Sequence, residues 1–299
     1  MKKVWNWGPL FIVIAASLWA LDGIIRRNLY VLPPIIIVFF EHLVGTLLLA
    51  PVIIKGLKKE KLTRGEWSAV GIVALFSSLL GTLWFTTALL MTSYISFSVV
   101  FLLQKLQPIF AIGTARIVLK EKISKQYMVW ATLALCAAYF ITFPKGVVNF
   151  NTGDKTIIAA LFALGSAVAW GSTTAFSRFT LLHHDDKYIT SLRFGITTIM
   201  AGIAVFFLGQ QSVLSTVTWF QFLQFVFIAL STGMVALLLY YKGLKTTPVR
   251  VSTILELAFP FLAVFIDVAL YKTVISPVQI IAAAVLLFAM YKISHMQKI

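Results

Sequence analysis

Long apolar stretches alternate with short polar segments along the whole chain. A helix needs about 20 apolar residues to cross a bilayer core, and such runs recur throughout, bounded by charge, proline or glycine. They are continuous, as in IIAAAVLLFAM, and lack the strict alternation of a membrane β-barrel. The pattern therefore predicts an all-α integral membrane fold with ten transmembrane helices, at residues 9–26, 34–54, 67–91, 96–119, 126–143, 155–180, 187–208, 217–242, 249–271 and 276–293.

The composition supports a membrane location. Of 299 residues, 60% are hydrophobic and 12% charged, whereas soluble domains carry about 25% charged residues. The net charge of +15 does not indicate a nucleic-acid partner, because the basic residues lie in short segments between apolar runs. The single cysteine, Cys136, excludes an intramolecular disulfide. We therefore expect membrane lipids, and no nucleic acid, around this chain.

The distribution of Lys and Arg predicts the orientation, because short cytoplasmic loops hold the excess of these residues. If the amino terminus is inside, basic segments such as KGLKKEKLTRGE (55–66) are cytoplasmic, and the outer segments hold far fewer basic residues. We therefore predict a multi-pass protein of the cell membrane, an inner membrane in a cell that has two, with both termini cytoplasmic.

An internal repeat divides the chain. LLQKLQPIFAIGTARIVLKEKIS (102–124) aligns without a gap to ILELAFPFLAVFIDVALYKTVIS (254–276), at an offset of 152 residues. The alignment matches Pro108 to Pro260 and Ser124 to Ser276, and the same offset places Glu41 opposite Arg193. Two halves are predicted, residues 1–148 and 149–299, each with five helices. Because five is odd, the second half must cross the membrane upside down, as an inverted repeat.

The order of several short motifs resembles a known family. Each half has a Trp in its first helix; AL (88–89) and GLKTTPVR (243–250) precede the fourth helix, a mid-helix proline follows, and LKEKIS (119–124) forms a short acidic loop. With the two five-helix repeats, these features resemble the EamA-type members of the drug/metabolite transporter superfamily.

The resemblance covers nearly the whole chain but has two departures. The family usually has a Glu after the fourth helix of each repeat; Glu121 fits this position, whereas the second copy has Thr273. The spacing from Ala88 to Pro108 is also three residues longer than from Gly243 to Pro260. What the resemblance implies is a small-metabolite carrier, often an exporter. Its central cavity would be lined mainly by the first, third, fourth, sixth, eighth and ninth helices, with the fifth and tenth outside.

Ionisable residues at membrane depth are the first candidates for a binding site, because they are costly there and usually face a cavity or a partner. Lys105 lies near the middle of the predicted fourth helix, and Gln104 and Pro108 share its face by helical spacing. Glu256 occupies the position of Gln104 in the second copy. Lys105 would meet a substrate carboxylate, and Glu256 an ammonium or a proton. Alternatively, Lys105 pairs structurally with Glu256 or with Glu41.

Glu41 and His42 in the second helix form a further candidate pair, since a histidine beside a carboxylate can handle protons. Asp22 and Arg26 are four residues apart and fit a local ion pair. The other arginines within the apolar runs fall close enough to helix ends to snorkel, and we expect no site role for Arg116, Arg178, Arg193 and Arg250.

Aromatic residues lie on the helices that the family uses for its cavity, and their rings could hold a cation or a flat ring; packing in the bilayer explains them equally well. The candidates are Trp19, Trp84, Trp170 and Tyr240. Pro108 and Pro260 would kink their helices and are the expected moving parts.

The sequence favours transport over catalysis. It contains no phosphate-binding glycine loop, GxSxG, HExxH or CxxC motif, and HHDDK (183–187) is interpreted as a solvated loop rather than a metal site. We expect no cofactor and no enzymatic activity. The leading hypothesis is a secondary transporter of a small polar or zwitterionic metabolite, such as an amino acid or amine, working by alternating access; it leaves proton coupling and oligomeric state open. The alternatives are a lipid-flipping accessory or sensor, or a carrier of a larger cationic or nucleoside-type metabolite.

Overall fold

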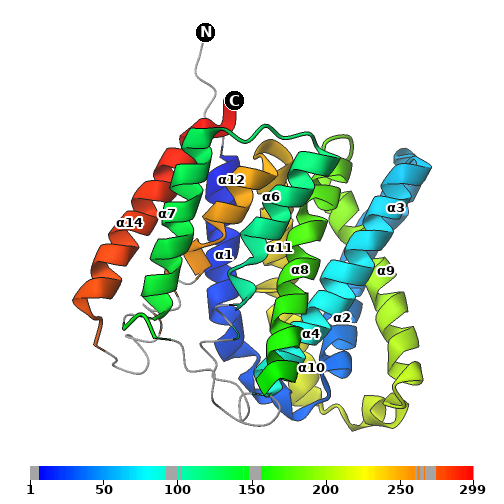
Figure 1. Cartoon of the computed structure of the whole chain (residues 1–299). Helices are drawn as coiled ribbons and strands as arrows, with labels where there is room; N and C mark the ends of the chain where they lie inside the picture. The colour runs from blue at the N-terminus through cyan, green and yellow to red at the C-terminus, as the bar shows by residue number, and fades with distance from the viewer. Residues whose placement is uncertain are drawn as a thin grey trace.

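The structure is a computed structural model that describes residues 7–91, 100, 103–143, 145–147, 156–259, 261–262, 266 and 274–298, and these residues form helices and connecting turns without a strand. The start of α1 and the end of α14 lie at the same end of the bundle, which we call the terminal end (Figure 1). The opposite end carries the other set of loops.

The first half contains seven described α- or π-helical segments and one 3-10 helix. They are α1 (Gly8–Ile25), η1 (Arg27–Val31), α2 (Pro34–Lys59), α3 (Arg64–Ile72), the π-helix η2 (Val73–Gly81), α4 (Thr82–Leu90), α6 (Gln107–Val118) and α7 (Lys125–Thr142). The segments α3, η2 and α4 form one continuous apolar helix, Arg64–Leu90.

The described part of the second half has the same kind of organisation. It contains α8 (Thr156–Leu181), α9 (Asp186–Phe207), η3 (Gln211–Thr216), α10 (Trp219–Leu230), α11 (Met234–Thr246), α12 (Val249–Leu255), α14 (Pro277–Ser294) and η4 (His295–Lys298).

Six helices among the described residues are long and apolar enough to cross a membrane. They are Pro34–Lys59, Arg64–Leu90, Ile157–Leu181, Asp186–Phe207, Trp219–Thr246 and Pro277–Ser294, and Gly8–Asp22 is a shorter apolar helix. Each falls on one of the ten predicted spans. The full number of ten remains a prediction.

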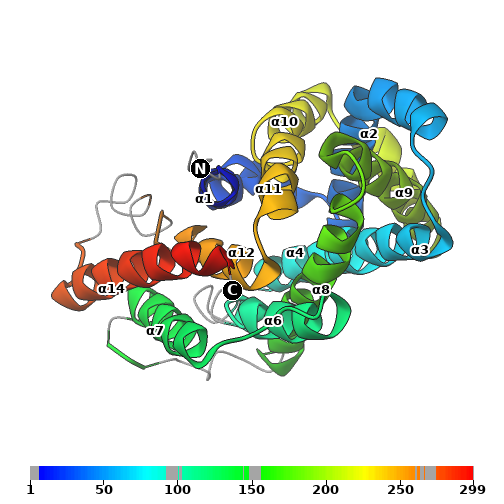
Figure 2. The same cartoon turned by 90° about the horizontal axis from the view of Figure 1, so that it is seen from above.

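Helices α7 and α14 show the repeat at the level of helix ends. Each bound of α14 lies 152 residues after the corresponding bound of α7. Both helices begin after a serine cap, since Ser124 accepts from the backbone N–H of Tyr127 and Ser276 from that of Gln279. The two helices pack against each other and lie at one edge of the bundle, as Figure 2 shows.

Helices α2 and α9 pack together at the other side of the bundle. Thr46 on α2 and Thr198 on α9 are 152 residues apart in the sequence. Their hydroxyl groups form a hydrogen bond, with the two oxygens 2.7 Å apart. Residues at equivalent positions of two repeats meet only where the symmetry axis passes between them. The contact is the one expected at a pseudo-two-fold axis between α2 and α9. The division into residues 1–148 and 149–299 remains a prediction.

Several helices are interrupted along their length. The turn at residues 105–106 precedes α6, residues 256–257 form a turn after α12, and residues 231–233 separate α10 from α11. The π-helix η2 is a comparable irregularity. Discontinuous helices free backbone polar groups inside a membrane protein and commonly build binding sites, so these four places are where we look for a site.

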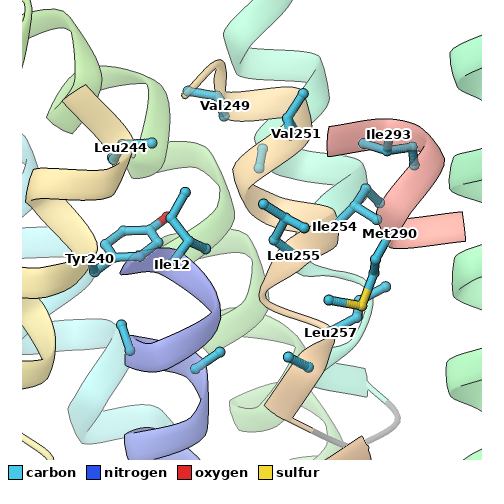
Figure 3. Close-up of a cluster of buried hydrophobic side chains, with 14 of the residues drawn as sticks. Ile12, Tyr240, Leu244, Val249, Val251, Ile254, Leu255, Leu257, Met290 and Ile293 are labelled. Carbon is cyan, nitrogen blue, oxygen red and sulfur yellow. The ribbon is translucent and has the colours of Figure 1, made fainter. Parts of the chain in front are cut away.

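A hydrophobic core surrounds α12. Figure 3 shows Val251, Ile254 and Leu255 on α12, with Tyr240 on α11 reaching toward α1 and Ile12 beside it. Val251, Ile254 and Ile12 are fully buried. The core therefore fixes the position of α12 and of the Tyr240 ring, on which the site depends.

Gly56 in α2 allows a close approach of α9. A Cβ added at Gly56 would lie 2.0 Å from the ring of Tyr188, whereas one added at Gly71 in α3 would meet nothing within 4 Å. We expect Gly56→Ala to lower the free energy of unfolding by about 1–3 kcal/mol, as overpacking does. Gly71→Ala is the matched control and should be neutral or slightly stabilising, because alanine favours helix more than glycine does. Unfolding of the purified protein in detergent measures both, and equal stabilities would contradict the prediction.

Candidate functional site

Glu256 is the centre of a polar cluster at the end of α12. Its Oε1 accepts hydrogen bonds from the Tyr240 hydroxyl at 2.6 Å and from the Ser252 hydroxyl at 3.4 Å. Its Oε2 accepts one from the Gln107 side-chain amide at 3.0 Å. Three segments meet here: α11 brings Tyr240, α12 brings Ser252, and the start of α6 brings Gln107.

An aromatic pair forms the α1 side of this cluster. The rings of Trp19 on α1 and Tyr240 on α11 lie 5.2 Å apart at an interplanar angle of 53°. The single hydroxyl hydrogen of Ser252 lies between Glu256 and the Tyr240 hydroxyl oxygen, which is 3.2 Å away. The cluster therefore combines a flat apolar surface with a carboxylate, an amide and two hydroxyl groups.

The Glu256 carboxylate has neutral hydrogen-bond donors and, among the described residues, no cationic partner. Burying an ionised group without a counter-charge is costly. Such a group at membrane depth usually contacts a ligand or takes up a proton. Among the predicted site residues, Glu256, Tyr240 and Trp19 are brought together by the fold.

Lys105 does not join this cluster. Its ammonium donates to the Ala138 carbonyl at 3.3 Å and to the Thr142 hydroxyl, both on α7. Both structural pairings considered for it, with Glu256 and with Glu41, are wrong in the described structure. Glu41 pairs with Arg26 instead, and the last turn of α7 offers Lys105 backbone carbonyls that favour a cation.

Helical spacing placed Gln104 on the candidate face with Lys105, but the glutamine that contacts Glu256 is Gln107. The reason is the turn at residues 105–106, which ends the helical register. Pro108 is buried in the first turn of α6, so it follows a helix break rather than kinking a continuous helix. Pro260 lies outside the described residues, and its predicted role remains a prediction.

The contacts of Lys105 predict that it braces α7 rather than binding substrate. We expect Lys105→Met to lower the free energy of unfolding by about 1–3 kcal/mol, because the variant removes the ammonium donor from Ala138 and Thr142. Substrate affinity should change less than about threefold, well below the effect of losing a charged hydrogen bond. Detergent unfolding and ligand titration separate the two effects. A loss of binding with unchanged stability would return Lys105 to the substrate site.

Glu41 lies in a second cluster at the end opposite the terminal end. Arg26 contacts Glu41 through Nη1 at 2.8 Å and Asp22 through Nε at 2.5 Å, which confirms the predicted local pair. Asp22 also accepts from the Thr232 hydroxyl at 2.5 Å. The cluster joins α1, α2 and the break between α10 and α11.

His42 packs within the scaffold. Its Nδ1 lies 2.8 Å from the Val38 carbonyl, which can only accept, so this nitrogen carries the hydrogen. Its ring lies 5.1 Å from the ring of Phe194 on α9, and the side chain is buried. In this arrangement His42 contributes to the α2–α9 contact.

Trp84 and Trp170 pack at the contact between α8 and the irregular helix Arg64–Leu90. Trp170 donates its indole N–H to the Ser77 carbonyl of η2 at 2.8 Å, and its ring lies 5.1 Å from that of Phe85. Trp84 fits against Gly165, where an added Cβ would lie 3.0 Å from its ring. Both residues hold α8 against the irregular helix, a structural role.

The terminal end carries a buried pair that sequence reasoning missed. Arg178 on α8 contacts Glu121 at 3.1 Å. Glu121 also accepts from the backbone N–H groups of Val249 at 2.8 Å and Arg250 at 3.1 Å, so it caps α12. Arg178 is therefore paired inside the bundle and does not snorkel.

Arg193 and Arg250 were also expected to snorkel, and both lie inside the bundle instead. Arg250 is only 4% exposed and donates to the Met296 carbonyl at 3.4 Å. Arg193 donates to Ser78 at 2.5 Å, to the Tyr241 hydroxyl at 2.8 Å and to Ser77 at 2.9 Å. The alignment of Arg193 with Glu41 was the signal that could have identified it.

The HHDDK segment is largely solvated as predicted, since His183, Asp185 and Lys187 are exposed. His184 is partly buried between Glu60 at 2.8 Å and Glu66 at 3.2 Å, so it joins α2, α3 and the α8–α9 turn. The described residues contain no group of His, Cys, Asp or Glu that could hold a metal ion. The contacts are those of a structural connection at the terminal end.

Apolar helices with interruptions around a carboxylate define a membrane transporter rather than an enzyme. The model of the EamA-like transporter family matches twice, at residues 6–143 and 157–294. The chain belongs to this family, which confirms the resemblance, and it is a non-enzymatic membrane protein.

Curated relatives cover nearly the whole chain. The chain is 36% identical over 294 residues to the riboflavin transporter ImpX of Fusobacterium nucleatum, covering 97% of this chain and 98% of the relative. It is 24% identical to an uncharacterized transporter of Clostridium kluyveri, covering 88% and 84%. It is 22% identical to Protein LicB of Haemophilus influenzae, covering 93% and 94%. A solved crystal structure has a TM-score of 0.76 at 17% identity, covering 97% and 98%, and shares the fold.

Proposed function

We propose that this chain is a secondary transporter that moves a small polar metabolite with a flat ring by alternating access. Riboflavin is the first compound to test. The observation that carries the proposal is Glu256, a carboxylate held by neutral donors beside the Trp19–Tyr240 pair. A relative that is named a riboflavin transporter supports the choice of compound.

The chemistry of the Glu256 cluster suits a ring with hydrogen-bonding edges. A heteroaromatic N–H can donate to Glu256, and ring carbonyls can accept from the Gln107 amide. The aromatic surface of Trp19 and Tyr240 can stack on the ring. For a zwitterion such as an amino acid, the sequence hypothesis used Lys105 for the carboxylate and Glu256 for the ammonium, and their contacts with different helices remove that support.

We propose the membrane arrangement that the sequence predicted: ten spans, both termini cytoplasmic and two inverted halves. In this arrangement the Arg178–Glu121 pair closes the cytoplasmic side of the site and the Arg26–Glu41–Asp22 cluster the outer side. Export and import are then the same motion run in opposite directions, and the solute gradient sets the direction.

Proteoliposomes containing the purified protein test the function. We expect riboflavin loaded on one side to drive accumulation of labelled riboflavin from the other, with unlabelled amino acids and amines failing to compete. An imposed pH gradient that changes the rate would indicate proton coupling. Liposomes with Glu256→Ala protein are the control. Equal flux in wild-type and variant liposomes would reject the proposal, and so would competition by amino acids alone.

A further inference from the structure

Arg193 lies inside the bundle among hydroxyl groups. Its partners Ser77, Ser78 and Tyr241 are 6%, 1% and 1% exposed, and they come from η2 and α11. Tyr241 in turn donates to Ser177 on α8 at 2.9 Å. Arg193 as a whole is partly buried. It therefore lies among polar side chains that come from η2, α8 and α11.

The hydrogen-bond inventory of this cluster leaves donors unused. A guanidinium has five N–H donors, and three of its bonds go to the two serines and the tyrosine. Two N–H groups remain, and the hydroxyls of Ser77 and Ser78, which accept from Arg193, retain their own hydrogens. An arrangement of donors around a cation fits an oxyanion.

The charge balance differs from that of the other internal arginines. Arg26 contacts two carboxylates and Arg178 one. Among the described residues, no carboxylate lies within 4 Å of the Arg193 nitrogens. His42 is within electrostatic range of Arg193, but it is not an anion. Within the part of the chain that the structure describes, Arg193 is therefore met by hydroxyl oxygens and by the Tyr241 ring, 5.6 Å away, and not by a carboxylate.

The repeat symmetry places this charge close to the middle of the protein. Arg193 and Glu41 each lie five residues from the Thr46–Thr198 contact along their own helices, on α9 and α2. At 1.5 Å per residue that is about 7.5 Å to either side of the proposed axis. Tyr241, which contacts Arg193, is the chain neighbour of Tyr240, which contacts Glu256. The rings of Tyr240 and Tyr241 lie 6.2 Å apart, so the Arg193 cluster adjoins the proposed substrate site.

We propose that Arg193, Ser77 and Ser78 form an oxyanion subsite that binds a phosphate or carboxylate group, either on the transported solute or as a free anion. The flavin measurements that distinguish these two sources rest on the proposed function. The binding of inorganic phosphate does not depend on flavin transport, so the oxyanion subsite and the proposed function can fail separately.

Thermal unfolding of the purified protein tests the subsite directly. At constant ionic strength, inorganic phosphate should raise the unfolding temperature of the wild type and of Arg193→Lys, because ligand binding stabilises the folded state. Arg193→Gln should lose this response. Arg116→Gln removes an exposed arginine on α6 and should keep it. A wild type that does not respond, or an Arg193→Gln variant that responds fully, overturns the inference. If Arg193→Lys and Arg116→Gln lose the phosphate response together with Arg193→Gln, the response is not specific to the Arg193 site, and the inference is also overturned.

Flavin fluorescence quenching then identifies the source of the oxyanion. If the solute carries it, Arg193→Gln should weaken binding of riboflavin 5′-phosphate about tenfold or more, the size expected for a charge-assisted hydrogen bond, and riboflavin binding much less. If Arg193→Gln changes neither flavin affinity but loses the inorganic phosphate response, the ligand is a free anion. If neither flavin binds the wild type, the flavin proposal fails and the phosphate measurement alone decides the subsite.

Discussion

Glu256→Gln is expected to reduce substrate affinity and transport by about 10–100-fold, because hydrogen bonds to charged groups contribute about 1.5–3 kcal/mol. The wild-type carboxylate can only accept, and three donors already point toward it, from Tyr240, Ser252 and Gln107. A substrate N–H would complete this set.

The glutamine amide changes the hydrogen-bonding pattern without changing the size of the side chain. Its NH2 group would face one of the three donors, so either a protein hydrogen bond or the substrate hydrogen bond is lost. The removal of a buried charge partly offsets the effect on folding. Binding should therefore fall much more than stability does.

Ligand titration and proteoliposome flux measure the expected loss. Gln104→Leu is the matched control, since Gln104 occupies the equivalent repeat position but Gln107 makes the contact with Glu256. Tyr240→Phe should give an intermediate loss, because it removes the 2.6 Å hydrogen bond and keeps the ring beside Trp19. Wild-type affinity in Glu256→Gln would place the substrate elsewhere.

Glu121→Ala is expected to cause the largest loss of stability, roughly 3–5 kcal/mol, as when one member of a buried ion pair is removed. Glu121 is 7% exposed and Arg178 15%. The substitution leaves Arg178 without its counter-charge. It also uncaps α12, whose N-cap residue is Pro248 and supplies no side-chain acceptor. Glu121, in the connection between α6 and α7, supplies the missing acceptor for the first backbone N–H groups of α12.

A double-mutant cycle measures the Glu121–Arg178 interaction. We expect Glu121→Ala combined with Arg178→Met to be less destabilised than the sum of the single variants, because the double variant buries no unpaired charge. Glu121→Gln should fall between wild type and Glu121→Ala, since its amide oxygen can still accept from Val249 or Arg250. Additive effects would show that the two side chains act independently.

Local features were predictable from the chain alone. The apolar runs predicted the six long helices that the structure confirms. The i, i+4 spacing of Asp22 and Arg26 predicted their ion pair. The offset of 152 anticipated the matched caps of α7 and α14. Glu256, Tyr240 and Trp19 were named as site candidates, and the fold brings these three together, although their role in binding remains a proposal.

Helical spacing failed where the helix stops. Gln104 and Lys105 were predicted to lie on the site face because a continuous helix was assumed. The turn at residues 105–106 interrupts that helix. The turn gives Gln107 the contact with Glu256 and directs Lys105 to α7. A break of one or two residues rotates every later side chain, and a proline nearby signals the break without giving its position.

The sequence by itself determined the membrane class, the repeat and the family, because hydrophobic length and chain-wide similarity are properties of the residues in order. Only the tertiary structure decided the partners of the buried charges whose partners lie far away in the sequence. Arg178 meets Glu121, Arg193 meets Ser77 and Ser78, and Glu256 meets Gln107, each across a long stretch of chain. The strength of such contacts depends on distance and on exclusion of water, and neither is set until the helices pack.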